Sequence, residues 1–134
     1  MRLVTLLALL VIMSTSCSST PSPTHPVTAA NLGTTITVRG RAVNRKFGAQ
    51  VVGEGFELWL EGVHEWPEDY NAAGDRGQWV EVTGALAEDH KLPVFVPSDD
   101  QPVVQGIPVP PGTDLEAASH RYVLRDATWR PVND

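Results

Sequence analysis

Three groups of side chains in this chain of 134 residues could do chemistry. The first is its one cysteine, Cys17, which follows an apolar run over residues 3–13 and the small residues 14–16. A thiol is a nucleophile and can accept a covalent group. The second is the acidic segment from His64 to Asp69, and the third is a set of four tryptophans, Trp59 among them. Tryptophans can line a pocket for a sugar, a peptide or peptidoglycan, or they can complete a core.

The segment from His64 to Asp69 combines one imidazole with three carboxylates, a set that suits metal binding or acid–base catalysis. The four histidines include no pair with His-x-x-x-His spacing, and there is no second cysteine. The chain also lacks a Gly-x-Ser-x-Gly elbow and a glycine-rich phosphate loop. We therefore expect no enzyme activity, no metal and no cofactor. A metal-binding protein or enzyme that uses this cluster is the alternative.

The N-terminus has the order of a secretory signal peptide: a basic start at Arg2, the apolar run, and then small residues. A membrane span needs about 20 apolar residues, so the run is too short to be one. With Cys17 at the cleavage point, the segment resembles the lipobox of bacterial lipoproteins, although Ser14 stands where leucine is preferred. The resemblance implies that residues 1–16 are removed and that Cys17 carries a diacylglycerol and an N-terminal acyl chain such as palmitate.

The resemblance also bears on location. Ser18 lacks the aspartate that goes with inner-membrane retention, which favours the outer membrane, facing the periplasm, if the organism has two membranes. An ordinary signal peptide whose cysteine stays free is the alternative. Residues 17–32 are rich in Ser, Thr and Pro and predict a flexible tether. Residues 33–131 then form a single domain.

The charge balance disfavours two classes of partner. With 10 basic and 16 acidic residues, the chain has a formal net charge of −6. Nucleic-acid binding depends on neutralising phosphates with Lys and Arg, so we expect no nucleic acid. Attraction to anionic lipid headgroups is disfavoured for the same reason.

From residue 34 onward, apolar and polar residues alternate as in β-strands. Leu58 and Val82 are expected to face a core, with Trp59 and Glu81 on the opposite face. Gly40 and Gly84 fall inside strands, where glycine often marks a bend or bulge. The predicted strands cover residues 34–42, 49–52, 56–61, 78–86 and 119–129.

Two other segments have a distinct character. Residues 67–73 begin with a proline and two acids, which predicts a short helix between the third and fourth strands. Residues 97–118 are long, dense in proline and aperiodic, which is typical of a functional or disordered loop. We expect this loop to be partly ordered and to form one wall of a binding site.

The element order predicts an all-β fold, a small five-stranded Greek-key barrel with one short helix between strands 3 and 4. It resembles the OB-fold, and a β-sandwich is the structural competitor. The resemblance implies a binding face on strands 2 and 3, bordered by two loops. Trp59 would lie on this face, with Arg45 and Lys46 in one loop and Val103 and Ile107 in the other.

Together these observations predict a membrane-anchored, non-enzymatic binding or scaffolding module. Its partners would be membrane lipid, through acylated Cys17, and an envelope protein, peptide or glycan.

Overall fold

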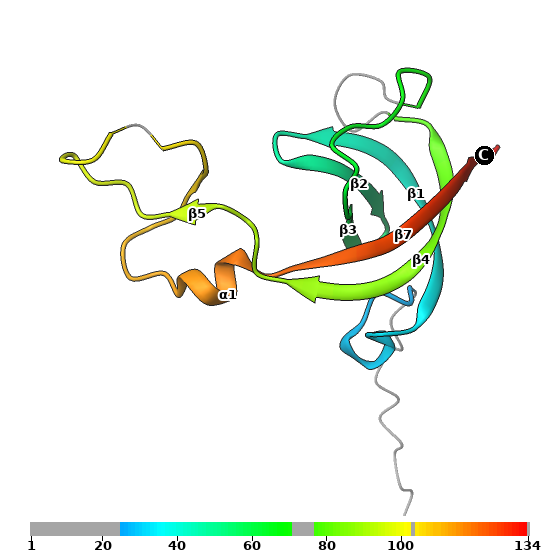
Figure 1. Cartoon of the computed structure of the whole chain (residues 1–134), viewed down its shortest axis with the longest axis horizontal. Helices are drawn as coiled ribbons and strands as arrows, with labels where there is room; N and C mark the ends of the chain where they lie inside the picture. The colour runs from blue at the N-terminus through cyan, green and yellow to red at the C-terminus, as the bar shows by residue number, and fades with distance from the viewer. Residues whose placement is uncertain (1–24, 71–76, 103, 134) are drawn as a thin grey trace, which may run out of the picture.

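Five strands close into a barrel in the computed structural model of the chain, which describes residues 25–70, 77–102 and 104–133 (Figure 1). The barrel strands are β1 (Thr35–Arg45), β2 (Gly48–Gly53), β3 (Phe56–Leu60), β4 (Trp79–Asp89) and β7 (Arg121–Pro131). They follow the order β1-β2-β3-β7-β4, and β1 pairs with β4 to close the barrel. All neighbours are antiparallel except β3 and β7, which are parallel. The predicted five-stranded barrel is therefore confirmed, and it is consistent with an OB-like fold.

Strand β1 pairs with two neighbouring strands, and Gly40 lies where β1 passes from one to the other. Residues 35–41 pair with β4, and residues 41–45 pair with β2. A Cβ atom on Gly40 would lie 2.6 Å from the carbonyl oxygen of Val52 and 2.8 Å from Val51 Cγ1. Both contacts are too short, so this approach of β1 to β2 requires glycine. At the other predicted glycine, Gly84, the register between β4 and β7 shifts between Thr83 and Ala85.

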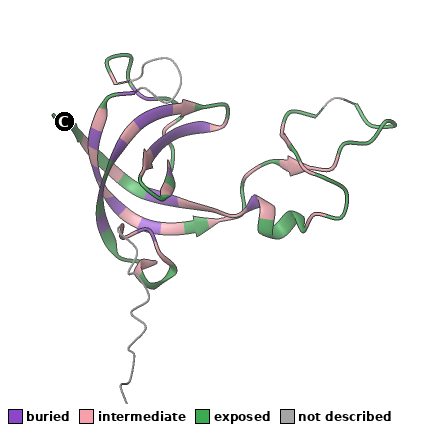
Figure 2. Ribbon diagram, turned by 180° about the vertical axis from the view of Figure 1, so that it is seen from behind, coloured by how far each residue is buried: buried purple, intermediate pink, exposed green. Residues whose placement is uncertain are grey.

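Alternate residues of the strands fill the barrel interior, which appears as buried positions along each ribbon (Figure 2). Full burial of an aliphatic side chain stabilises a fold by about 1.5–3 kcal/mol. Leu58 and Val82 are completely buried, as predicted, while Trp59 and Glu81 are only partly buried. The other buried strand residues of the core are Ile36, Val38, Ala42, Ala49, Val51, Leu60, Val80, Leu86 and Leu124.

Trp66, in the loop after β3, packs into this core and is 2% exposed. Its indole Nε1 donates a hydrogen bond of 2.8 Å to the carbonyl oxygen of Gln50, and its backbone N donates one of 2.7 Å to Asn44 Oδ1. The Trp129 ring meets it edge-on at 5.1 Å. The Trp66 side chain is therefore buried with the hydrogen-bonding capacity of its one polar atom, Nε1, satisfied.

The segment before β1 packs against the opposite end of the barrel (Figure 1). Val27 is 6% exposed and belongs to the core, and the His25 ring lies 5.1 Å from that of Phe56. A short 3₁₀ helix, η1 (Ala29–Asn31), follows. The packed part of the chain thus includes residues 25–32, ahead of the predicted boundary at residue 33. Residues 17–24 of the predicted tether lie outside the described residues.

The short helix is not where the sequence suggested. Residues 68–70 form a turn, in which the backbone N of Tyr70 donates to the carbonyl oxygen of Pro67 at 2.8 Å, and residues 71–73 lie outside the described residues. The helix α1 (Leu115–Ser119) lies between β6 and β7 instead. The Asp114 side chain caps it by accepting hydrogen bonds from the backbone N of Glu116 and Ala117.

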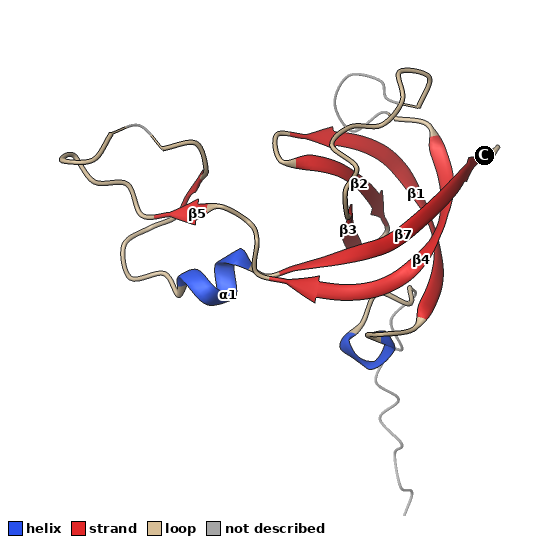
Figure 3. Ribbon diagram, viewed as in Figure 1, coloured by secondary structure: helices blue, strands red, loops and turns tan. Residues whose placement is uncertain are grey.

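Residues 90–120, which we call the arm, project from one side of the barrel between β4 and β7 (Figure 3). The arm contains β5 (Val94–Phe95), β6 (Ile107–Pro108) and α1. Strands β5 and β6 form a parallel pair of two residues each. Strand β5 directly follows Pro93, and part of the proline-dense loop is ordered as β6 and α1.

Candidate functional site

A groove of about 390 Å³ lies where the arm meets the outer face of β2 and β3. One side comes from the turn between β1 and β2, the floor comes from β2 and β3, and the other side comes from β6. The lining residues are Arg45, Lys46, Phe47, Gln50, Glu57, Trp59, Gly106, Ile107 and Pro108. Four of the five predicted binding residues, Arg45, Lys46, Trp59 and Ile107, are therefore brought together. The fifth, Val103, lies outside the described residues.

Trp59 reaches the groove because of strand alternation. Its neighbours Leu58 and Leu60 point into the core, so its own side chain lies on the outer face. There it pairs in register with Gln50 on β2 and with Val123 on β7. Gln50 is 2% exposed and Val123 is fully buried, although both lie in this outward-facing row. The groove floor is thus well packed rather than solvated.

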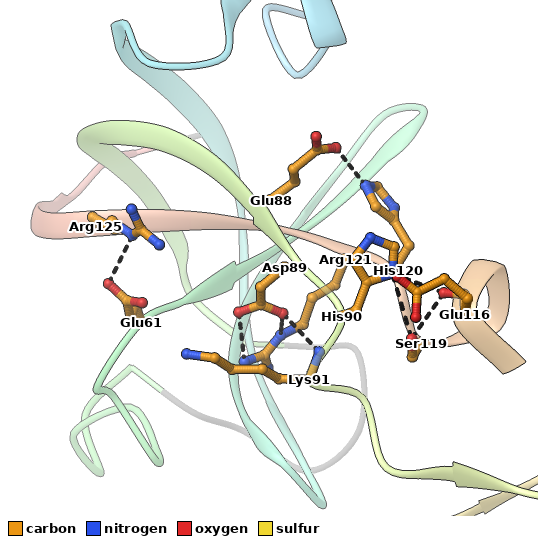
Figure 4. Close-up of polar contacts among 10 residues, drawn as sticks. All are labelled: Glu61, Glu88, Asp89, His90, Lys91, Glu116, Ser119, His120, Arg121 and Arg125. Carbon is orange, nitrogen blue, oxygen red and sulfur yellow. Dashed lines mark hydrogen bonds and ion pairs between the residues drawn. The ribbon is translucent and has the colours of Figure 1, made fainter.

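Arg121 holds the Trp59 ring from the side of β7. Its guanidinium carbon lies 5.3 Å from the ring centroid, a cation–π geometry. The same guanidinium makes two hydrogen bonds to the Asp89 carboxylate, with Nε–Oδ1 at 2.7 Å and Nη2–Oδ2 at 3.2 Å (Figure 4). The side chains of Arg121 and Asp89 are 17% and 9% exposed. A bidentate pair of this kind fixes the orientation of the guanidinium plane.

The electrostatics of this pair favour an ionised carboxylate. Burial raises the pKa of Asp89, but hydrogen bonds from the Arg121 side chain and the Lys91 backbone outweigh it, together with the charges of both cations. The pKa of Asp89 is therefore held below its usual range. Asp89 consequently acts as a fixed anion that orients Arg121.

The β1–β2 turn contributes the cationic side of the groove. Arg45 Nε donates a hydrogen bond of 3.1 Å to Gln50 Oε1, and the Lys46 ammonium lies 5.3 Å from the Phe47 ring centroid. Gly48 has a φ of +142°, and a Cβ atom there would lie 3.5 Å from Trp59 Cε3. The backbone conformation at this position thus favours glycine, whereas the distance to the Trp59 ring is an ordinary van der Waals contact.

A second polar cluster lies at the base of the arm. The rings of His90 and His120 are 5.4 Å apart, and His120 Nε2 lies 2.8 Å from Glu88 Oε2 (Figure 4). Ser119 Oγ is 3.4 Å from His90 Nδ1, but its shorter hydrogen bond, of 2.8 Å, goes to the carbonyl oxygen of Glu116. His90 Nδ1 lies 2.7 Å from that same oxygen. The serine proton is directed at a carbonyl rather than at a base, so this geometry does not activate a nucleophile.

Sequence reasoning missed Asp89, Arg121 and the two histidines of the arm base. Asp89 and His90 are separated in the sequence from His120 and Arg121 by the arm. The two pairs meet because β4 and β7 are paired along their length, as far as Asp89 opposite Arg121. The signal that could have found the Asp89–Arg121 pair is the register between β4 and β7, which sets these two residues opposite one another.

The acidic segment from His64 to Asp69 shows no sign of a built site. Its three carboxylates and its imidazole are all exposed. Within residues 25–70, 77–102 and 104–133, no three His, Cys, Asp or Glu side chains are grouped so as to hold a metal ion. Among the described residues, this segment therefore gives no geometric support to the metal alternative.

Cys17, the predicted lipidation site, lies outside the described residues. In the part of the chain that the structure describes, no helix has the length and apolar character needed to cross a membrane. The chain matches no protein-family model, no curated protein and no solved structure.

Proposed function

We propose that this chain is a lipid-anchored protein of the cell envelope that acts as a non-enzymatic binding or scaffolding module. The observation that carries the proposal is the groove, in which Trp59 on the outer barrel face lies between the cationic β1–β2 turn and Ile107 of the arm. Sites at which loops border one face of a small barrel are a recurring place for ligands. The ligand would be a segment of an envelope protein, a peptide or a glycan.

Anchoring is supported by the N-terminal pattern that ends at Cys17. One acyl chain binds a membrane only marginally, and two or more give stable attachment, at about 0.8 kcal/mol per buried CH₂. A diacylglycerol and an additional acyl chain on Cys17 would keep the barrel at the membrane surface. In a cell with two membranes, the outer membrane, facing the periplasm, is the proposed location.

Two polar pairs beside the groove support binding rather than catalysis. Asp89 is paired with Arg121, and Gln50 Oε1 accepts a hydrogen bond from Arg45. Groups held in such pairs position one another, whereas a general base needs a free lone pair beside the substrate. Nucleic acid is disfavoured by the net charge of −6 and by the carboxylate of Glu57 in the groove.

Site-specific photo-crosslinking tests this proposal. A photo-reactive amino acid at Ile107, in the groove, should capture an envelope component in cells. The same group at Thr128, an exposed position on β7 outside the groove, should not. Capture at Ile107 should decrease strongly when Trp59→Ala is added. Equal capture at both positions, or none at Ile107, would argue against a binding groove.

A further inference from the structure

We infer that the groove takes an extended peptide segment in which an acidic side chain stands beside bulky apolar ones. This inference rests on the proposed function and narrows the ligand to one chemical class. Three properties of the groove support it: the walls are largely apolar, the polar group at the floor is already hydrogen-bonded, and the β1–β2 turn is positively charged.

The walls of the groove are largely apolar. Phe47 and Trp59 line it from the barrel, and Ile107 and Pro108 line it from the arm. Its volume of about 390 Å³ is at the lower end of the range typical of ligand sites. Extended peptides commonly dock in aromatic-lined grooves of this kind, with side chains filling the apolar positions. A short segment with bulky apolar side chains therefore suits both the size and the lining.

A glycan suits the groove less well. A sugar ring stacks on an open aromatic face, but Arg121 already lies over one face of Trp59. Sugar hydroxyls also need hydrogen-bond partners, and Gln50, at the floor, is 2% exposed with its Oε1 bonded to Arg45. Polar ligand groups left unpaired against an apolar wall weaken binding. The groove thus favours side chains of low polarity along Trp59.

The positive charge of the β1–β2 turn favours an acidic residue beside the apolar residues of the ligand. Arg45 and Lys46 are adjacent, exposed and on the same side of the groove, in a chain whose net charge is −6. The Lys46 ammonium rests near the Phe47 ring, 5.3 Å from its centroid, and so stands beside an apolar wall. A carboxylate of the ligand at this point would be attracted by the Lys46 ammonium. Glu57 lies elsewhere in the groove, on β3, and would repel a second acidic group there.

The test uses the full chain, purified in detergent, and an array of octapeptides. Each peptide has a Leu-Ile or Leu-Pro-Ile centre flanked on one side by two Asp, two Lys or two Ser residues. We expect the wild type to bind the Asp set about tenfold more tightly than the Lys set, a difference within reach of a rim charge. Lys46→Glu should abolish or reverse this preference. Arg39→Glu, the same reversal of charge at an exposed arginine on β1 outside the groove, should leave it intact.

Two further variants connect binding to the groove itself. Trp59→Ala and Ile107→Asp should each weaken binding of the Asp set. Ile107 is on the arm and outside the barrel core, so its variant should keep the melting temperature of the wild type. Equal binding of the three peptide sets, or a preference that survives Lys46→Glu, overturns the inference.

Failure of the inference and failure of the proposed function have different signatures. A labelled peptidoglycan oligosaccharide that binds in a Trp59-dependent manner, without any peptide binding, overturns the peptide ligand and leaves the binding module in place. If neither peptides nor the oligosaccharide bind, and the photo-reactive group at Ile107 captures nothing, both proposals are wrong.

Discussion

Arg121 lies over the ring of Trp59, with its guanidinium carbon 5.3 Å from the ring centroid. Arg121 is the first residue of β7, directly after the arm, and it is paired with Asp89, the last residue of β4, directly before the arm. One ion pair therefore closes the base of the arm, and one of its members also supports the aromatic floor of the groove. The position of the arm and the shape of the groove are coupled through these three side chains.

Asp89→Asn should lower the free energy of unfolding at pH 7 by about 1–3 kcal/mol, because it removes the charge partner of a largely buried guanidinium. Folding lowers the pKa of Asp89. The ionised carboxylate therefore stabilises the fold above its unfolded-state pKa of about 3.9, and this contribution is lost as the pH falls through the lower folded-state pKa. Urea melts between pH 7 and pH 2 should show a steeper acid loss below about pH 4 for the wild type than for Asp89→Asn. Parallel curves would contradict this role of Asp89.

Val82→Ala should lower the free energy of unfolding by about 1–3 kcal/mol, because Val82 is fully buried and truncation leaves a cavity. The adjacent Glu81 faces outward and is paired with Arg130 at 2.7 Å. Since exposed ion pairs contribute little, Glu81→Ala should cost less than about 1 kcal/mol. Urea melts of the two variants measure the difference. Equal costs, or the reverse order, would be incompatible with the register of β4.

Trp66 offers a graded test of how the core is completed. Trp66→Ala should cost about 3–5 kcal/mol, because the indole is 2% exposed and its removal opens a large cavity. Trp66→Phe keeps most of the apolar volume but removes the indole hydrogen bond to the carbonyl oxygen of Gln50, so it should cost about 1–3 kcal/mol. Thermal melts rank the variants. A Phe variant as unstable as the Ala variant would show that the hydrogen bond, rather than the volume, dominates.

Replacing residues 99–112 with a short Gly/Ser linker removes β6 and with it the arm side of the groove. No residue between 99 and 112 belongs to the core cluster found among the described residues, so the melting temperature should change little. Partner capture at a photo-reactive group on the β1–β2 turn should be lost. A large decrease in melting temperature would instead make this segment a structural cover of the barrel.

Cys17→Ala should abolish lipid attachment, because no other thiol exists in the chain to accept it. The precursor should accumulate uncleaved, or the protein should leave the membrane fraction. Metabolic labelling with palmitate and fractionation of cells measure both effects. A Cys17→Ser variant that still fractionates with membranes at the mature mass would rule out anchoring at this residue.

The barrel could be predicted from the sequence because its signal is local. Alternation fixes which residues of each strand face inward, and it placed Leu58 and Val82 in the core and Trp59 outside. The helix was misplaced for the opposite reason. Residues 67–70 have the composition of a helix start, but they form a turn after the buried Trp66, closed by the hydrogen bond from Tyr70 to Pro67. The helix capped by Asp114 was missed because the surrounding stretch is rich in proline.

The groove was partly predictable. Arg45, Lys46, Trp59 and Ile107 followed from the resemblance to a barrel with two flanking loops, and the structure places all four around one groove. The Asp89–Arg121 pair was not predictable from local pattern, because it depends on the register between two strands separated by the whole arm. Interactions of this kind require the topology first.

The packing of Val27 and His25 against the barrel end limits the length of the linker between the proposed lipid anchor and the domain. In the anchored form, only residues 18–24 separate the acylated Cys17 from His25. An extended chain spans at most about 3.3–3.6 Å per residue, so the barrel end could stand no more than about 25–30 Å from the lipid-bearing residue. A partner would then have to come to the membrane surface to be bound, so the anchored protein would act only within the layer next to the bilayer.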